Sequence, residues 1–156
     1  IKLYQSGKQE EEFRKQYEEQ ERYNLTAMPD MGISEIIFHR PTRGMVSSVF
    51  DANKKHFGVD IAATPNESVL ATLDGTVILS TYTAETGYVI QVQHSRDFVS
   101  IYKHCGSLLK KVGDTVKAGE VIALVGNTGE KTTGPHLHFE LWNKGRAIDP
   151  SKYIVF

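Results

Sequence analysis

Hydrophobic and polar residues alternate along most of this chain after Gly44, and short glycine-containing segments interrupt the alternation at close intervals. A period of two residues is typical of β-strands with one buried face. The segments with this pattern are 45–50, 68–72, 76–79, 87–93, 98–104, 121–125 and the segment that begins at His136. Because no segment after residue 25 has a clear helical pattern, the sequence predicts an all-β fold, an antiparallel barrel or sandwich.

The interrupting segments predict the turns between these strands. Asp74-Gly75 predicts a hairpin turn, because glycine accepts the positive φ that tight turns need. Further turns are predicted at 95–97, at Gly113-Asp114 and at Ala118-Gly119, and a loop is predicted at 126–129. Strands this short, joined by close turns, indicate antiparallel neighbours along the chain.

The N-terminal part has a different pattern. Its first two dozen residues are charged and helix-prone, with Phe13 and Tyr17 four residues apart and opposite charges at helical spacing. We therefore predict two parts: a short, charged, helical N-terminal arm with its connecting segment at 1–39, and one β-domain at 40–156. The chain opens with Ile1 rather than Met, which indicates a trimmed or mature fragment and is compatible with a membrane tether upstream.

Composition narrows the class of protein. The 156 residues are 40% hydrophobic and 24% charged, which is ordinary for a globular protein. The net charge of -1 argues against a nucleic-acid partner, since such proteins usually have a basic surface. No apolar run approaches the ~20 residues that cross a bilayer. The single Cys105 excludes an internal disulfide and a multi-cysteine zinc site, and we interpret it as a small buried residue.

The last long strand carries two histidines on one face. His136 and His138 are two residues apart and therefore lie side by side at about 6.6 Å, while Leu137 and Phe139 point into the core. Such a pair can divide its work, with one ring on a metal and the other handling a proton or an oxyanion; two surface histidines are the alternative. Glu140 shares this face, where it either orients a ring beside a metal or is a solvated carboxylate at the rim.

A second group of metal-ligand residues lies earlier in the chain. On a straight strand His56 and Asp60 would be about 13 Å apart, but Gly58 permits a bend that brings them together. Two histidines and one aspartate supply N and O ligands for zinc and leave a fourth position for water, as in catalytic sites. His104 ends a predicted strand with Tyr102 on the same face, and taken alone it is typical of a hydrogen-bonded structural histidine.

Three motifs together resemble one family. The segment 56–60 reads H-x-G-x-D, 102–104 reads Y-x-H, and 134–140 reads G-P-H-L-H-F-E. In this order and spacing they resemble the M23 (lysostaphin/LytM-type) family of zinc metalloendopeptidases, and the likeness extends over about 40–154. The glycine often found in the family after the Ala-Ala-Thr-Pro-like segment is Asn66 here, which also tolerates left-handed turn geometry.

The resemblance implies a site and a function. It implies that His56, Asp60 and His138 bind Zn²⁺, and that His104 and His136 are catalytic histidines that flank the water without binding the metal. A histidine near neutral pH can take a proton or hydrogen-bond an oxyanion, and the sequence does not divide these tasks between the two. The implied partners are peptidoglycan peptides, which are cleaved in cross-links or stem peptides in the periplasm or outside the cell. We expect the D-alanyl cross-link.

Two other functions fit parts of the sequence. The first is a non-catalytic LytM-like domain that binds or activates another cell-wall hydrolase. Such relatives typically lose ligands, and none is lost here. The second is a biotinyl or lipoyl carrier, because 112–125 resembles half of that β-fold. A carrier needs an exposed lysine in a tight hairpin, but the loop 126–129 occupies that place and Lys131 lies in no matching motif.

Overall fold

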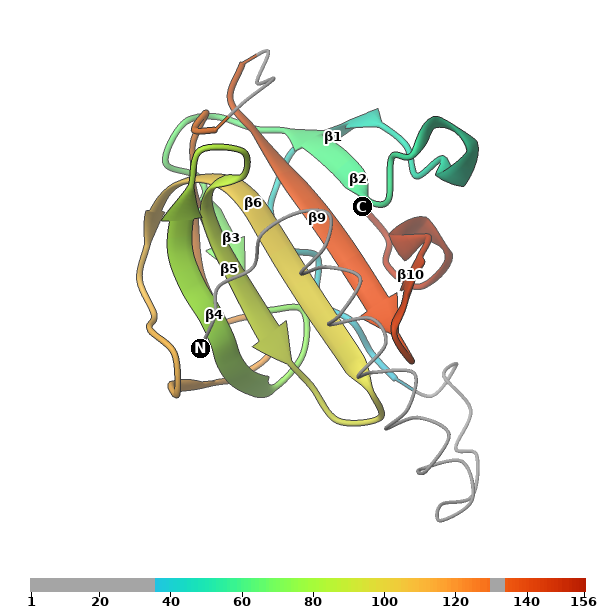
Figure 1. The fold of residues 1–156 in the computed structure, drawn as a ribbon, viewed down its shortest axis with the longest axis vertical. Coiled ribbons are helices and arrows are strands. Elements are labelled where there is room, and N and C mark those ends of the chain that lie inside the picture. The colour runs from blue at the N-terminus through green and yellow to red at the C-terminus, as the bar shows by residue number, and fades with distance from the viewer. Residues whose placement is uncertain (1–35, 130–133) are drawn as a thin grey trace.

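The computed structural model describes residues 36–129 and 134–156. Ten antiparallel strands form the fold of this part of the chain (Figure 1). The arm predicted within 1–35 and Lys131 lie outside these described residues. The strands are β1 Met45–Ser48, β2 Val59–Ala62, β3 Ser68–Leu70, β4 Gly75–Thr83, β5 Gly87–Gln93, β6 Phe98–Leu108, β7 Thr115–Val116, β8 Val121–Val125, β9 His136–Asn143 and β10 Arg146–Ile148. The predicted all-β, antiparallel fold class is therefore confirmed.

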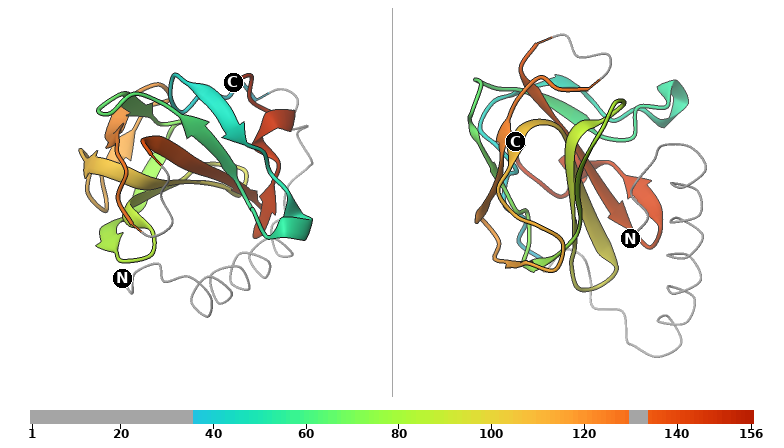
Figure 2. Two further views of the ribbon diagram at one scale, coloured as in Figure 1. Left: turned by 90° about the horizontal axis from the view of Figure 1, so that it is seen from above. Right: turned by 60° about the vertical axis from the view of Figure 1, so that its left-hand side comes forward.

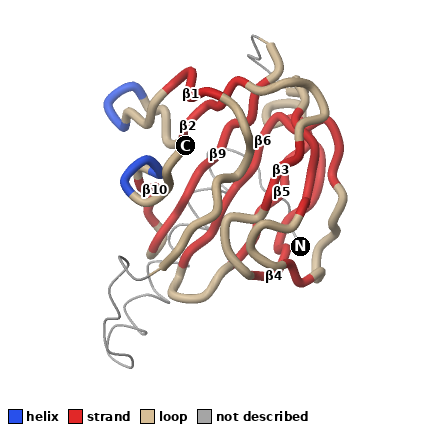
Figure 3. The backbone as a smooth tube through the Cα atoms, turned by 180° about the vertical axis from the view of Figure 1, so that it is seen from behind, coloured by secondary structure: helices blue, strands red, loops and turns tan. Residues whose placement is uncertain are grey.

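The helical content of the described residues is small. Two 3₁₀ helices, η2 Ala52–Lys54 and η3 Pro150–Lys152, follow β1 and β10 respectively (Figure 3). An aspartate caps each of them: Asp51 accepts from two backbone N–H groups of η2, and Asp149 accepts from one of η3. No helix in the described ranges has the length and apolar character needed to span a membrane.

The long strands β9 and β6 lie at the centre of the sheet, and each pairs with three other strands. The main order is β1-β2-β9-β6-β5-β4-β7, so β9 lies between β2 and β6. The first part of β6 pairs with β5 and β9, and its last part pairs with β8, which also pairs with β3. The sheet is strongly twisted and curved, as the two views of Figure 2 show. Residues far apart in the sequence, on β2, β6 and β9, thereby become neighbours.

The main core lies on one face of these strands. From β9 it takes Leu137, Phe139 and Leu141, which confirms the predicted alternation along this strand. Cys105 is fully buried in the same core, as predicted from its size and apolar character. Other buried members are Val59, Ile61, Val69, Ala71, Val77, Ile90, Val92, Phe98, Tyr102, Val116, Ile122, Ala123, Val125 and Ile154, and Ile36 and Phe38 pack against them.

A smaller apolar cluster lies on the opposite face of the central strands. Its members are Leu79, Val89, Val99, Ile101 and Trp142, all at most 4% exposed. Because successive strand residues point to opposite faces, β5 and β6 supply both clusters. The central strands are therefore buried on both sides along this part of the sheet.

A hydrogen-bonded polar chain crosses the main core. The buried His94 places Nε2 2.7 Å from Ser100 Oγ, which lies 2.8 Å from the hydroxyl of Tyr102. That hydroxyl accepts from the backbone N–H of Thr72, and Nδ1 of His94 donates to the carbonyl oxygen of Asp74. Burial lowers the pKa of His94, although the Asp74 carbonyl opposes this effect. His94 is thus a neutral structural residue, in agreement with its omission from the predicted site.

Most predicted turns are present, but the hairpin at Asp74-Gly75 is wrong. The strands on either side of it do not pair: β3 pairs with β8, and β4 pairs with β5 and β7. Asp74 instead makes long-range contacts, accepting from the N–H of Ala118 through Oδ1. Asn66 adopts a left-handed φ of 66°, in agreement with the expectation that asparagine tolerates this geometry here.

Candidate metal centre

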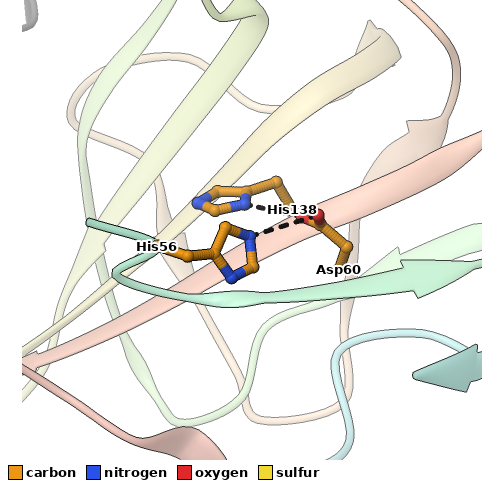
Figure 4. A group of neighbouring side chains, drawn as sticks. All are labelled: His56, Asp60 and His138. Carbon is orange, nitrogen blue, oxygen red and sulfur yellow. Dashed lines mark hydrogen bonds and ion pairs between the residues drawn. The ribbon is translucent and has the colours of Figure 1, made fainter. Parts of the chain in front are cut away.

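Strands β2 and β9 place two of the expected ligands opposite each other. In the antiparallel register Asp60 pairs with His138, and Ala62 pairs with His136. The carboxylate oxygen Oδ1 of Asp60 lies 2.7 Å from Nδ1 of His138 (Figure 4). The two residues are 78 positions apart in the sequence, so only the pairing of these strands brings them together.

The turn before β2 brings His56 to the same point. Its backbone pairs with Asp51, the cap of η2, and its Nε2 lies 3.1 Å from Oδ2 of Asp60 (Figure 4). Gly58 permits this approach, since a Cβ there would overlap the carbonyl oxygen of Phe139. The bend that the sequence predicted at Gly58 is therefore present, and it joins the two halves of the H-x-G-x-D motif.

The ring nitrogens show that this cluster fits a cation. Nδ1 of His56 lies 2.8 Å from the carbonyl oxygen of Val49, which can only accept, so Nδ1 carries the proton. Nε2 of His56 then directs a lone pair toward the Asp60 carboxylate. His138 places a carboxylate oxygen at each ring nitrogen, but a neutral imidazole has one proton to donate. A positive ion among these lone pairs removes the repulsion that they would otherwise have.

The donor set is suited to zinc. One ligand atom from each of His56, Asp60 and His138 lies within 4.8 Å of the others. Two imidazole nitrogens and one carboxylate oxygen are ligands that zinc accepts, and three protein ligands leave a position for water. The side chains are 25%, 23% and 12% exposed, so the centre is open on one side. A substrate can reach a metal held there.

Two further histidines lie beside this cluster. The ring centroids of His104 and His136 are 5.2 Å apart, and those of His104 and His138 are 6.2 Å apart. Nδ1 of His104 donates to the carbonyl oxygen of Thr128 at 2.7 Å, and Nδ1 of His136 donates to that of Gly134 at 2.9 Å. In both rings Nε2 is left as the nitrogen for chemistry. The structure thus brings all five predicted site residues together.

A β-bulge in β6 places His104 in the site. Tyr88 pairs with Cys105 and Ile90 pairs with Tyr102, so Lys103 and His104 together oppose one residue of β5. His104 has a left-handed φ of 63°, which non-glycine residues rarely adopt. The prediction that Tyr102 and His104 share a face is wrong, because the bulge turns His104 toward the site while Tyr102 stays in the core.

The surroundings of His104 and of Asp60 lower the pKa of each group, for different reasons. Burial lowers the pKa of His104, an effect that the Thr128 carbonyl opposes and that His138, His136 and Lys103 reinforce. For Asp60, burial raises the pKa, but the hydrogen bond and charge of His138 and the other nearby histidines lower it more, and the net pKa is lowered. At neutral pH His104 is therefore a neutral base and Asp60 is an anion, as a metal ligand must be.

Glu140 is a buried member of the site rather than a solvated carboxylate at the rim. Its side chain is only 4% exposed and contacts Lys103, His138 and Trp142. Burial alone would raise the pKa of Glu140, but the charge of Lys103 and the bond to His138 outweigh it and hold this pKa below its ordinary value. The sequence had left both interpretations open. It did not indicate Lys103, because this residue meets Glu140 only through the pairing of β6 with β9, in which Lys103 lies opposite His138.

An open pocket of about 590 Å³ adjoins the site at the β1–β2 edge. Ala62 lines it and pairs with His136 in register, and Pro135 also lines it, so the pocket begins next to a candidate catalytic histidine. The other lining residues are Arg43, Gly44, Met45, Ala63, Thr64, Pro65 and Glu67. The surface here has room for a peptide that extends away from the metal ligands.

The sequence matches a known family and named relatives. The model of the family described as "Peptidase family M23" matches residues 54–150. The chain is 42% identical over 115 residues to an "Uncharacterized metalloprotease" of Haemophilus influenzae, covering 67% of this chain and 24% of that protein. It is 37% identical over 117 residues to "Murein hydrolase activator NlpD" of Escherichia coli, covering 73% and 30% respectively.

A third relative has an enzymatic name. The chain is 36% identical over 97 residues to "Peptidoglycan DD-endopeptidase ShyA" of Vibrio cholerae, covering 62% of this chain and 22% of that one. The chain thus spans less than a third of the length of these curated relatives.

Solved structures share the fold. A zinc-containing peptidase from Vibrio cholerae superposes with a TM-score of 0.72 at 32% identity, covering 78% of this chain and 41% of that one. Csd3 of Helicobacter pylori gives a TM-score of 0.68 at 31% identity, covering 78% and 34%. The fold is therefore that of known proteins.

Proposed function

Since this chain belongs to peptidase family M23, we propose that it is a zinc metalloendopeptidase that hydrolyses peptide bonds in bacterial peptidoglycan. The observation that carries the proposal is the convergence of the two groups of site residues. His56, Asp60 and His138 form the metal cluster, and His104 and His136 lie beside it with Nε2 available. A chain that had lost catalysis would have no need to keep all five.

The contacts of each side chain support the role that we propose for it. When bound, zinc supplies Lewis acidity, which makes water a nucleophile near neutral pH and polarises a peptide carbonyl. His104 and His136 each have Nδ1 fixed by a backbone carbonyl, so each ring can accept a proton at Nε2. Once protonated, the same nitrogen can donate to a developing oxyanion or return the proton to the leaving amine. Asp60 supplies the negative charge that offsets the dication.

The proposed substrate is the D-alanyl cross-link of peptidoglycan. The relative named as a DD-endopeptidase supports this choice, although this chain matches only 22% of it. The open pocket beside His136 and Ala62 provides room for the peptide on one side of the cleaved bond. Because peptidoglycan lies outside the cytoplasmic membrane, we also propose that the protein works at the cell envelope and that 40–156 is the part that carries the activity.

Digestion of purified cell walls tests the proposal. The zinc-loaded protein should release peptide fragments whose masses identify the cleaved bond. His104→Ala and His136→Ala should retain zinc and lose activity by about 10²–10⁴-fold each, because neither ring is a proposed ligand. The double variant should be little worse than the worse single one if the two rings serve one step. Asp60→Ala and His138→Ala should lose both metal and activity.

An activator role is the second candidate, favoured by the 37% identity to a murein hydrolase activator. It predicts a different result in the same assay. The zinc-loaded protein would release nothing from walls of several types, yet would speed release by an added cell-wall hydrolase. In that case His104→Ala and His136→Ala would leave the stimulation unchanged, and the peptidase proposal would be wrong.

A further inference from the structure

We propose that Glu140 is the positioning residue for His138: its carboxylate accepts a hydrogen bond from Nε2–H and thereby aims the Nδ1 lone pair at the metal. This inference rests on the proposed metal-binding function of His56, Asp60 and His138. Glu140 itself does not reach the cluster, because its oxygen contacts the far nitrogen of the His138 ring.

The geometry around His138 carries the inference. Nδ1 lies 2.7 Å from Oδ1 of Asp60, and Nε2 lies 2.8 Å from Oε2 of Glu140, so the ring is held between two carboxylates. The alternation along β9 produces this arrangement, since residues 138 and 140 lie on one face of the strand. A neutral ring that binds a metal at Nδ1 must carry its proton at Nε2, where Glu140 is the acceptor.

Two donors hold Glu140 in place. Nζ of Lys103 lies 2.9 Å from Oε2, and Nε1 of Trp142 donates to Oε1 at 2.8 Å. The three contacts divide between both carboxylate oxygens, so the group cannot rotate without losing a bond in a site where its side chain is 4% exposed. Since the Lys103 ammonium and the indole N–H can only donate, each requires an acceptor, and an ionised carboxylate provides one at each oxygen. Glu140 is thus an anion fixed in direction.

An alternative is that Glu140 only neutralises the buried Lys103. That role requires the Lys103 contact alone and gives no reason for Oε2 to lie 2.8 Å from the His138 ring. When a residue accepts a hydrogen bond from the non-ligating ring nitrogen of a metal-binding histidine, replacing that residue typically lowers metal affinity by about 10–100-fold. Zinc affinity therefore separates positioning from simple charge balance.

The experiment measures zinc affinity and the state of the His138 ring. Zinc affinity is determined by competition with a chromophoric chelator for the unaltered protein, Glu140→Ala and Glu140→Gln. We expect a loss of about 10–100-fold for Glu140→Ala. Glu140→Gln keeps a neutral acceptor for the Nε2 proton and should recover part of this loss. Circular dichroism establishes that each variant is folded.

In the Glu140 variants the ammonium of Lys103 loses its charged partner, and two controls test whether this unpaired charge alone weakens zinc binding. The pair Lys103→Met with Glu140→Gln removes both charges and retains the neutral acceptor, so it should bind zinc as Glu140→Gln does. Glu120→Gln removes the charge pair with Lys110, a partly exposed residue whose Nζ lies 2.6 Å from Glu120, and should bind zinc with unchanged affinity. Together they compare the Lys103–Glu140 pair, which contacts the His138 ring, with the Lys110–Glu120 pair, which is not part of the site.

Nitrogen NMR of the unaltered protein tests the same idea without any variant. In the zinc-loaded protein the His138 ring should carry its proton on Nε2, and Nδ1 should show the shift of a metal-bound nitrogen. A proton on Nδ1 would overturn the proposal, and so would unchanged zinc affinity in folded Glu140→Ala. If His138→Ala kept its zinc, the metal assignment itself would be wrong. If Glu140 variants lost zinc affinity while the unaltered protein cleaved no cell walls, positioning would stand and only the peptidase function would fall.

Discussion

Backbone carbonyl oxygens fix three of the site histidines in the same tautomer. Val49 accepts from His56, Thr128 from His104 and Gly134 from His136, always at Nδ1. All three rings therefore direct Nε2 toward the metal cluster or the substrate. The sequence could name these histidines by motif. It could not assign the working nitrogen, because a motif does not show which carbonyl oxygen each ring contacts.

Thr128 links the loop before β9 to the bulge that carries His104. Its hydroxyl donates to the carbonyl oxygen of Cys105 at 2.6 Å and accepts from the N–H of Tyr88 at 3.0 Å, while its own carbonyl accepts from His104. Thr128→Val keeps the shape and removes both hydroxyl bonds. We expect a loss of about 1–3 kcal/mol in the free energy of unfolding, measured in urea, and reduced hydrolysis with zinc retained.

Thr128→Ser is the matched control, because it keeps the hydroxyl and removes only a methyl group. It should have a stability and an activity closer to those of the unaltered protein. Equal losses in Thr128→Ser and Thr128→Val would show that packing of the methyl group, rather than hydrogen bonding, holds this loop.

The buried His94 gives the stability of the fold a dependence on pH. Its pKa is lowered in the folded state by burial, whereas the unfolded chain binds a proton near the ordinary value of about 6.5. The unfolded state therefore binds more protons below that pH, and the contribution of His94 to stability is lost as pH falls from above 6.5. The slope attributable to one such group is at most about 1.4 kcal/mol per pH unit.

Urea denaturation at pH 7.5 and pH 5.5 measures this effect. Because other histidines also titrate, the comparison is with His94→Gln, which cannot be protonated but can still hydrogen-bond. The unaltered protein should lose more stability than the variant between the two pH values. Parallel losses would mean that His94 does not contribute to the pH dependence.

At the scale of the elements, regular strands were predictable and irregular ones were not. The alternation along β9 correctly predicted which residues face the core and which face the site. The bulge in β6, which lies opposite β5, has no local pattern, and the short strand β10, which pairs with β9 directly before it, was not among the predicted strands. Because of the bulge, the sequence wrongly placed Tyr102 on the same face as His104. Lys103 received no role because its contact with Glu140 depends on the pairing of β6 with β9.

Gly58 determines how closely β2 approaches β9. A Cβ at this position would overlap the carbonyl oxygen of Phe139 and lie 3.0 Å from Nε2 of His138. Gly58→Ala should push the start of β2 away and separate Asp60 from His138. We expect weaker zinc binding in the chelator assay and a loss of about 1–3 kcal/mol in unfolding free energy.

Gly106→Ala provides the comparison for Gly58→Ala within the same sheet. Its added Cβ would meet nothing closer than 3.3 Å, so the neighbouring loop needs to move by only a few tenths of an ångström. This variant should keep its zinc affinity. Unchanged zinc affinity in Gly58→Ala as well would show that β2 tolerates the displacement and that the cluster does not depend on this close approach.

At the scale of the whole molecule, three motifs identified the family before any geometry was known. The likeness over about 40–154 agrees with the family match at 54–150. Local physical reasoning could identify each motif by itself but could not show that the motifs form one site. His56, His104 and His138 come together only through strand pairing across the sheet. Sequence spacing contains no direct information on such long-range pairing. The metal cluster was therefore predictable by resemblance and not from local pattern.

Cys105 offers a measure of how the whole molecule opens. The thiol is fully buried in the main core, and burial raises its pKa to about 12. Thiolate is the reactive form, so a thiol reagent should react only after the core has opened. For a domain with at least about 5 kcal/mol of stability, labelling in native buffer should be about 10³-fold or more slower than in denaturant.

The labelling rate should also follow the global unfolding equilibrium as urea is added, because Cys105 packs in the same core as the long strands β6 and β9. The absorbance of the chromophore that the thiol reagent releases gives the rate. A Ser95→Cys, Cys105→Ala protein has its cysteine at an exposed turn and provides the fast reference. Rapid labelling of Cys105 in the native protein would contradict its assignment as an inert core residue. A nucleophilic role beside His104 would then replace it.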